Sequence, residues 1–260
     1  MPKTLDKPVP LTDERLERYN HDIIAFLEDQ FIVAETGKLI VLEGWQKDLI
    51  LRPLFYDLDE EGRRKYSLAL LGLPKKHGKS TLAAAIGVWS AFAGEQHGEI
   101  IVAANNLDQA SLIIYGKIRE AFKDNPQLAR AAILRKTHIE IKATGTIIRP
   151  IAHKYQTAAG VNPTLVLFDE IWGYSGREFY DELTESPARK DPLCLIVTYA
   201  GYDKDSLLYD LYKAGMKGTT LACSSSGSTR HWPRGLRRST WTRRSGGCRL
   251  TVISASTRID

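Results

Sequence analysis

The sequence has no run of about 18 or more apolar residues, the length that a membrane-spanning helix needs. Its first twenty residues lack the apolar segment of a secretory signal. Cysteine is scarce, and the three residues Cys194, Cys223 and Cys248 have neither metal-site nor disulfide-like spacing. We therefore expect no membrane segment, no secretory leader and a reducing, cytoplasmic environment.

Acidic residues are absent from one part of the chain, residues 211–259. Residues 1–218 carry 28 Lys and Arg against 30 Asp and Glu, whereas residues 219–260 carry eight arginines against the single acid Asp260. The net charge of +5 therefore comes from a short Arg- and Ser-rich tail and not from the body of the protein.

Apolar runs alternate with helical patterns along the body. Residues 66–73, 98–106, 164–170 and 193–201 have the continuous apolar character of buried strands. Helices are expected at 81–92, 107–122, 178–186 and 206–215, the last with Gly215 beyond its end, and a hairpin at 139–152 turning at Thr144–Gly145. This order predicts an α/β fold with a mostly parallel sheet covered on both faces.

The first 58 residues are expected to form a helical segment. Thr12 is a candidate N-cap for a helix whose apolar stripe comprises Leu16, Tyr19, Ile23, Phe26 and Leu27. A second helix at 44–58 should be interrupted near Pro53.

The stretch "GLPKKHGKST", residues 72–81, lies between a predicted strand and a predicted helix. In a phosphate-binding loop, or P-loop, this context turns backbone N–H groups and the helix dipole toward an anion. Lys79 would reach the phosphates and the Ser80 hydroxyl would bind Mg²⁺. The usual first glycine is missing, because residue 73 is Leu and Gly72 lies one position early. The alternative is a helix start that binds no ligand.

Two acids follow the apolar run "LVLF". ATP hydrolysis needs one carboxylate to hold Mg²⁺ and another to activate the attacking water, at the end of a strand neighbouring the P-loop strand. Asp169 is the candidate for the metal and Glu170 for the water. The alternative is a strand that ends in two solvated acids.

Further polar positions have less specific roles. Thr198 ends a predicted strand, where its hydroxyl would sense the γ-phosphate or simply close the strand. Gln46 would pair with the adenine edge through its donor and acceptor, or lie on the surface beside Trp45. Lys75 and Lys76 would contact phosphate or form a solvated basic loop.

The motifs "WQ", "LPKKHGKST", "IIVAANNLDQA", "AAGVNPTLVLFDEIW" and "PLCLIVTYAGYD" occur in an order that resembles the large terminase subunit of tailed bacteriophages. The resemblance covers about residues 40–218. It implies a P-loop NTPase fold of the ASCE type, a three-layer sandwich. It also implies a motor that hydrolyses ATP to move double-stranded DNA into a procapsid, followed by a nuclease domain.

The resemblance carries over to individual residues. Gln46 matches the adenine contact, Asp169 and Glu170 match the Walker B pair, and Thr198 matches the coupling motif. Lys75 stands where many relatives have arginine. Arginine can donate two parallel hydrogen bonds to a phosphate, whereas lysine cannot. The expected nucleotide-binding set is Gln46, Lys75, Lys76, His77, Gly78, Lys79, Ser80 and Thr81, with ATP and Mg²⁺ as cofactors.

Partners are also implied by the resemblance. They are double-stranded DNA, the phage portal protein, the small terminase subunit and further copies of the chain in a ring, in the cytoplasm of the bacterial host and without a membrane. The isolated chain is expected to be monomeric. An arginine supplied to a neighbouring subunit is expected among Arg119, Arg130, Arg135 and Arg149.

The tail departs from the resemblance. A nuclease domain needs clustered acids for two metals, and residues 219–260 hold only Asp260. We expect a motor domain at 1–218, no nuclease activity, and a poorly ordered tail that is either the product of a reading-frame shift or a genuine arm that binds DNA phosphates. The rival functions are another P-loop DNA motor, such as a helicase, and a non-enzymatic basic DNA-binding module.

Overall fold

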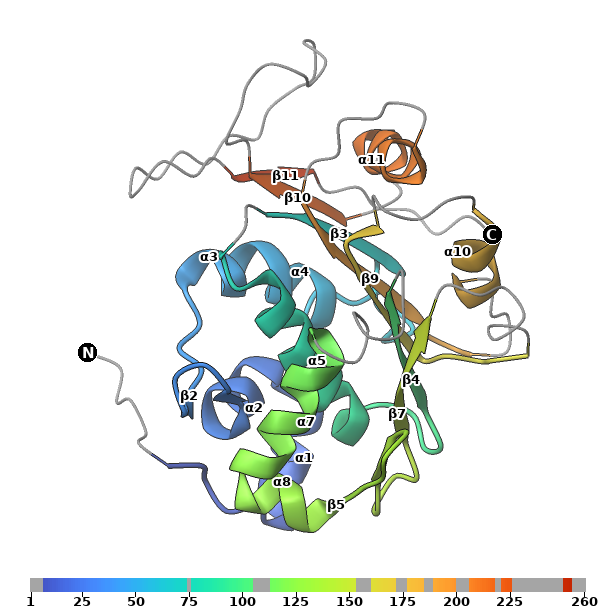
Figure 1. Cartoon of the computed structure of the whole chain (residues 1–260). Coiled ribbons are helices and arrows are strands. Elements are labelled where there is room, and N and C mark those ends of the chain that lie inside the picture. The colour runs from blue at the N-terminus through green and yellow to red at the C-terminus, as the bar shows by residue number, and fades with distance from the viewer. Residues whose placement is uncertain are drawn as a thin grey trace.

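The fold is built on a mostly parallel nine-stranded sheet (Figure 1). The computed structural model describes residues 7–73, 76–104, 113–152, 160–171, 177–184, 189–199, 206–217, 221–225 and 250–253. In sheet order the strands are β11 (Leu250–Ile253), β10 (Leu221–Ser225), β3 (Leu68–Gly72), β9 (Leu193–Thr198), β8 (Leu165–Asp169), β4 (Glu99–Ala104), β7 (Ile147–Ala152), β6 (Ile139–Ile141) and β5 (Ala132–Leu134). Pairing is parallel from β10 to β7 and antiparallel at both ends, which confirms the predicted sheet.

Helices cover both faces of the sheet and make three layers (Figure 1). One face carries α1 (Asp13–His21), α2 (Ile23–Gln30), α5 (Lys79–Ala93), α7 (Ile114–Asp124) and α8 (Pro126–Ala131). The other face carries α10 (Glu178–Thr184) and α11 (Leu207–Lys217). A small antiparallel pair, β1 (Ile32–Val33) and β2 (Lys38–Leu39), lies beside α2. The described residues include no helix both long and apolar enough to cross a membrane.

The alternation of side chains along the central strands divides the core in two. In β8, Leu165 and Leu167 face the α5 layer, whereas Val166 and Phe168 face α10 and α11. All five residues of β8 are buried. A strand that is apolar on both faces is the expected consequence of helices on both sides of a parallel sheet.

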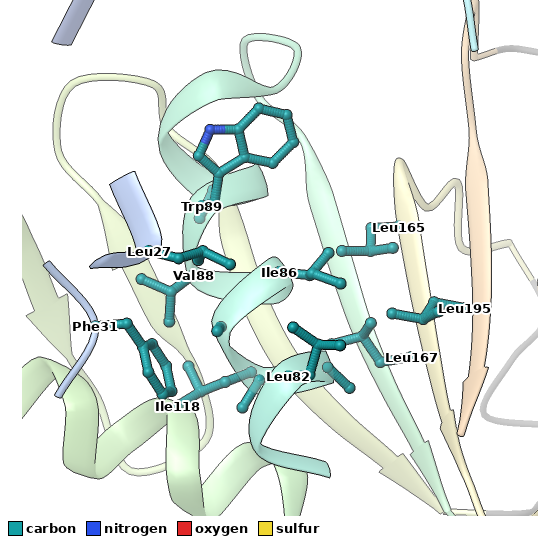
Figure 2. Close-up of a cluster of buried hydrophobic side chains, with 14 of the residues drawn as sticks. Leu27, Phe31, Leu82, Ile86, Val88, Trp89, Ile118, Leu165, Leu167 and Leu195 are labelled. Carbon is teal, nitrogen blue, oxygen red and sulfur yellow. The ribbon is translucent and has the colours of Figure 1, made fainter. Parts of the chain in front are cut away.

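Helix α5 packs unusually close to the sheet. A Cβ added at Gly87 would lie 2.9 Å from Leu167 Cδ1, so the bare glycine allows the helix to approach β8. Figure 2 shows Leu82 and Ile86 of α5 beside Leu167 and Leu195. This packing fixes the axis of the helix, and therefore the place where its N-terminus meets the ends of the strands.

The N-terminal segment forms two helices where one was expected. Thr12 caps α1 by accepting a hydrogen bond from the Arg15 N–H at 3.4 Å. Asp22 interrupts the run and caps α2 by accepting from the Ala25 N–H at 3.0 Å. Aspartate competes with helical hydrogen bonding in this way because its carboxylate satisfies free N–H groups. The predicted apolar stripe still faces the core, and Tyr19, Ile23, Phe26 and Leu27 are buried.

The interruption near Pro53 is a π-helical turn. The segment consists of α3 (Gly44–Gln46), the π-helix η1 (Lys47–Leu51) and α4 (Arg52–Phe55). Arg52 N–H donates to the carbonyl of Lys47, five residues earlier. Proline has no N–H and crowds the preceding turn, so a widened turn before it avoids a clash.

Two predicted helix boundaries differ from the structure. Gly215 lies inside α11 and not beyond its end, so that boundary was wrong. A single glycine weakens a helix by only about 1 kcal/mol, which packing overrides. The helix expected at 107–122 is described as α7, Ile114–Asp124, and the residues from 107 to 112 lie outside the described part of the chain.

The sheet continues past residue 218, where the motor domain was expected to end. Strand β10, Leu221–Ser225, pairs in parallel with the P-loop strand β3, and β11 pairs with β10. A five-residue strand is too short to show a clear period in the sequence. The rest of 218–260 lies outside the described residues, so the two hypotheses for the tail stay predictions. Translation of the other reading frames after codon 218 would decide between them.

Asn125 joins the N-terminal helices to the α7–α8 pair. It is fully buried, and its Nδ2 donates to the carbonyl of Gln30 at 2.7 Å. Its Oδ1 accepts from the N–H of Gln127 at 2.8 Å, which caps α8. One side chain therefore satisfies both a helix end and a buried carbonyl.

We predict that Asn125→Ala lowers the free energy of unfolding by about 2–4 kcal/mol, because it removes a helix cap and leaves the buried Gln30 carbonyl without its donor. Urea denaturation followed by circular dichroism would measure the loss. Gln127→Ala, on the same helix, is the matched control and should change the stability by less than about 0.5 kcal/mol. Equal losses in the two variants would contradict this role of Asn125.

Candidate active site

Three strands end level at one edge of the sheet. Gly72 of β3 is paired with Thr198 of β9, and Asp169 of β8 is paired with Val197. The N–H of Leu73 donates to the carbonyl of Thr198 at 3.0 Å, which continues the ladder into the loop. The ends of parallel strands form the crevice where α/β proteins bind ligands.

One predicted neighbour relation was wrong. The strand bearing Asp169 and Glu170 was expected beside the P-loop strand β3, but β9 lies between β8 and β3. Strand order in a parallel sheet is set by the crossover connections and not by the separation of motifs along the chain. The inserted strand places Thr198 between the loop and the two acids.

The loop before α5 adopts the strained backbone that a tight turn requires. Lys76 and Gly78 both have positive φ angles, of 66° and 72°. Gly78 caps α5, whose first turn contains Lys79, Ser80 and Thr81. The first N–H groups of a helix have no acceptor within the helix, so this end presents donors and a positive dipole to the crevice.

Of the remaining loop residues, one is exposed and two lie outside the described part of the chain. His77 is exposed beside the helix start. Pro74 and Lys75 lie outside the described residues, so the predicted phosphate contact of Lys75 has no structural description.

Lys79, Glu170 and Thr198 lie in contact at the edge of the sheet where β3, β9 and β8 end. Lys79 is 8% exposed, and its Nζ lies 3.0 Å from Glu170 Oε1. Thr198 Oγ1 lies 3.5 Å from Glu170 Oε2 and donates to the carbonyl of Tyr199 at 3.1 Å. Sequence analysis missed Tyr199, whose ring centroid lies 5.9 Å from Lys79 Nζ. Its position directly after the strand-end threonine was the available signal.

Glu170 has a strained backbone. Its φ angle is +52°, in the left-handed region, while its N–H donates to the carbonyl of Val197 at 2.9 Å. This conformation costs a non-glycine residue about 1–3 kcal/mol and is concentrated at functional sites. The turn directs the side chain of Glu170 toward Lys79 instead of along the strand.

Asp169 is a buried carboxylate without a hydrogen-bond partner. It is 2% exposed, and neither carboxylate oxygen has a partner within the described structure. Burial raises its pKa to about 6, the negative charge of Glu170 adds to this rise, and Lys79 opposes it. Buried polar groups are nearly always satisfied, so two unpartnered carboxylate oxygens suit the coordination of a cation.

The donor set at this edge fits Mg²⁺. No group of three or more His, Cys, Asp or Glu that could hold a metal occurs in the described part of the chain. Magnesium in nucleotide sites is nevertheless held by one or two carboxylates together with substrate phosphates and waters. Asp169, with the half-buried Ser80 at the start of α5, provides oxygen ligands of that kind.

Gln46 lies next to the loop, with its orientation fixed. Its Nε2 is 4.0 Å from the position that a Cβ on Gly78 would occupy. Its Oε1 accepts from the N–H of Glu43 at 2.9 Å, and the Glu43 carboxylate accepts in return from the backbone N–H of Gln46. Glu43 also accepts a hydrogen bond from the Trp45 indole. This reciprocal cap was not predicted from the sequence, and it leaves Nε2 without a hydrogen-bond partner among the residues that the structure describes.

Arg149 lies apart from the other three candidate arginines. Arg149 is ion-paired with Glu99 at 2.6 Å. Arg119, Arg130 and Arg135 lie on α7, on α8 and after β5, at the far end of the sheet from β3. The structure therefore brings none of Arg119, Arg130 and Arg135 to this chain's own P-loop.

A separate cavity of about 170 Å³ lies at the opposite edge of the sheet. Thr164, Leu165 and Leu193 line it at the start of β8 and β9, with Arg64 and Asp191. It lies at the other end of these strands from Asp169 and Thr198, and Arg64 is ion-paired with Asp191 at 3.3 Å.

Comparison with known proteins adds to this geometry. Residues 45–217 match the family model of the terminase large subunit, ATPase domain. The chain belongs to this family. The match covers most of the chain and includes the P-loop, both acids and Thr198, so the terminase chain carries an ATPase domain.

The solved structure of one other terminase shares the fold, and two further terminase structures align with lower scores. The HK97 bacteriophage large terminase is 21% identical with a TM-score of 0.67, over 76% of this chain and 41% of that one. The ATPase domain of the Thermus phage P74-26 large terminase is 18% identical with a TM-score of 0.48, over 73% of this chain and 76% of that one. The large terminase of the thermophilic bacteriophage D6E in complex with ADP is 10% identical with a TM-score of 0.45, over 57% of this chain and 37% of that one. This terminase chain thus spans about two fifths of the HK97 protein. No curated protein matches it.

The raised pKa of Asp169 predicts a pH-dependent stability. Above about pH 6 the folded protein buries an ionised carboxylate, whereas the unfolded chain solvates it. Asp169→Asn should therefore increase the free energy of unfolding at about pH 8 by about 1–3 kcal/mol. The gain should shrink as the pH falls below about 6 and vanish below about pH 3, where both states of the wild type are protonated.

Urea denaturation in the presence of a chelator, at several pH values, measures this difference. Asp181→Asn is the control, because Asp181 is partly exposed on α10 and paired with Arg177. A wild type that is more stable than Asp169→Asn at about pH 8 would contradict the prediction.

Proposed function

We propose that this chain is the ATPase motor of a phage DNA-packaging machine, hydrolysing ATP to translocate double-stranded DNA into a procapsid. The observation that carries the proposal is the convergence of Lys79, Glu170 and the unpartnered Asp169 at the N-terminus of α5. Membership of the terminase ATPase family supports it and disfavours the helicase and the non-enzymatic module.

The nucleotide would lie across the level strand ends. The first N–H groups of α5 and the Lys79 ammonium would bind the phosphates. Gln46, with its Oε1 held by Glu43, would donate from Nε2 to the adenine ring. Lys76, His77, Gly78, Ser80 and Thr81 would border the phosphates, and Lys75 belongs to the same proposed set.

Asp169 and Ser80 would hold Mg²⁺, which neutralises the charge that develops on the transferred phosphate. Asp169 suits this role because its oxygens are buried and unpartnered, so a cation would remove the cost of the isolated charge. Glu170 would accept a proton from the attacking water.

In the structure described here, Lys79 and Glu170 neutralise each other at 3.0 Å. Both roles require this ion pair to open, since Lys79 must reach phosphate and Glu170 must face water. Thr198 contacts Glu170 Oε2 at 3.5 Å and is placed to follow that movement. We propose that Thr198 couples the state of the nucleotide to the position of Glu170.

Partners follow from the same proposal. The motor would act in the cytoplasm of the bacterial host, as a ring of copies on the phage portal protein and with the small terminase subunit. The isolated chain would be monomeric and would lack nuclease activity. ATP turnover by the purified chain, stimulated by duplex DNA and dependent on the portal, would separate packaging from unwinding.

Glu170→Gln should bind ATP but hydrolyse it about 10²–10⁴-fold more slowly, because the water loses its proton acceptor. Phosphate release measures turnover and calorimetry measures affinity. Glu178→Gln, an exposed substitution on α10, is the matched control and should retain wild-type turnover. Wild-type turnover in Glu170→Gln would remove Glu170 from the catalytic role.

Lys79→Ala should weaken ATP binding by about 10- to 100-fold, since the phosphates lose a charged donor. Lys38→Ala, exposed on β2, should leave the affinity unchanged. If calorimetry finds equal affinities for wild type and Lys79→Ala, the loop before α5 does not bind phosphate.

A further inference from the structure

The basic residues of the body are concentrated in one segment. Residues 113–152 hold eight Lys and Arg against three Asp and Glu, whereas the rest of 1–218 holds 20 against 27. The body is nearly neutral as a whole, but residues 113–152 carry a net positive charge and the rest of 1–218 carries a net negative charge. This segment forms α7, α8, β5, β6 and β7, at the lower end of Figure 1.

Five of these residues form what we name the basic surface: Arg119, Arg130, Arg135, Lys136 and Lys142. Arg119 Nη1 donates to the carbonyl of Arg135 at 2.6 Å, so α7 meets the turn after β5. Lys142 Nζ donates to the carbonyl of Arg130 at 2.8 Å, so the turn after β6 meets the end of α8. The three residues of β5 separate the two groups by about 10 Å.

The nearby acids leave the basic surface positive. Glu140 pairs with Arg135 at 3.6 Å, but the Arg135 side chain is 54% exposed, so the pair is screened by solvent. Glu120 is paired with Lys123. Within the described residues, Arg130 and Lys136 are exposed and have no carboxylate partner. Carbonyl contacts hold Arg119 and Lys142 in place without cancelling their charge.

We propose that the basic surface binds the phosphate backbone of double-stranded DNA. Duplex DNA carries one charge per about 1.7 Å of its axis, so a surface of this length faces several phosphates. A protein partner fits less well, because protein interfaces have an apolar core. The exposed large apolar side chains of the described chain are Val41, Tyr56 and Leu58, all outside this segment. The inference rests on the proposed DNA substrate.

The basic surface is separate from the nucleotide site. Strands β5 and β6 end the sheet, and β7, β4 and β8 lie between them and β9. The tail strands β10 and β11 lie at the opposite end of the sheet. Substitutions here therefore leave Lys79, Asp169 and Glu170 in place, so DNA binding is testable apart from ATP hydrolysis.

The test compares two double variants of the full chain with equal changes in charge. Lys136→Glu with Lys142→Glu alters the basic surface, and Lys7→Glu with Lys38→Glu alters two exposed lysines elsewhere. Every variant keeps residues 219–260, so the tail contributes equally to all. Binding of a short labelled DNA duplex is measured by fluorescence anisotropy over a range of salt, together with ATP turnover without DNA.

The basic-surface variant should bind the duplex about tenfold or more weakly near 0.1 M salt, and its log–log salt slope should fall by about 2. The control should differ from wild type by less than about twofold, and turnover without DNA should be unchanged in both. The proposal is overturned if wild type binds no duplex, or if both variants bind like wild type or weaken equally. It is also overturned if the basic-surface variant loses self-association in sedimentation while its DNA binding is kept, since a second copy would then be the partner. If the wild type shows no ATP turnover without DNA, that result would instead contradict the ATPase proposal.

Discussion

The packing of α5 against the sheet is the contact on which the rest of the structure depends. Ten of the residues in this helix are buried, and Gly87 lets it lie against Leu167 of β8. Because a buried helix has little freedom to shift, its first residue, Lys79, is held where β8 and β9 end. The same packing directs the dipole of α5 at that edge. The hydrophobic core thereby determines the electrostatics of the site.

The site carries features that reduce stability. Asp169 is a buried carboxylate with no partner, and Glu170 has a left-handed backbone. Asp169 is the last residue of β8, whose five residues are all buried, and Glu170 directly follows it. The large core supports these costs, and a cation beside Asp169 would relieve the first of them.

The two ends of the sheet have different chemistry. The candidate nucleotide groups lie where the central strands β3, β9 and β8 end, whereas exposed basic residues lie in the turns that follow β5 and β6. A whole-chain charge of +5 conceals this separation, because the body is nearly neutral as a whole and the excess of positive charge lies in the tail, residues 219–260. The placement of charge on the surface, and not its total, favours one face for a polyanion.

Sequence patterns were enough to predict the α/β class, the four central strands and the candidates Lys79, Asp169, Glu170 and Thr198, because buried strands are apolar on both faces and a P-loop has a local signature. Tertiary structure alone decided that β9 separates β8 from β3, since strand order depends on crossovers. It also decided the Lys79–Glu170 pair, the cap between Glu43 and Gln46, and the meeting of Arg119 with Arg135. Most of these contacts join residues far apart in the chain, and the cap, though local, needs the side-chain geometry. A pattern along the chain therefore predicts which side chains are available, and only the packing of helices on the sheet decides which of them touch.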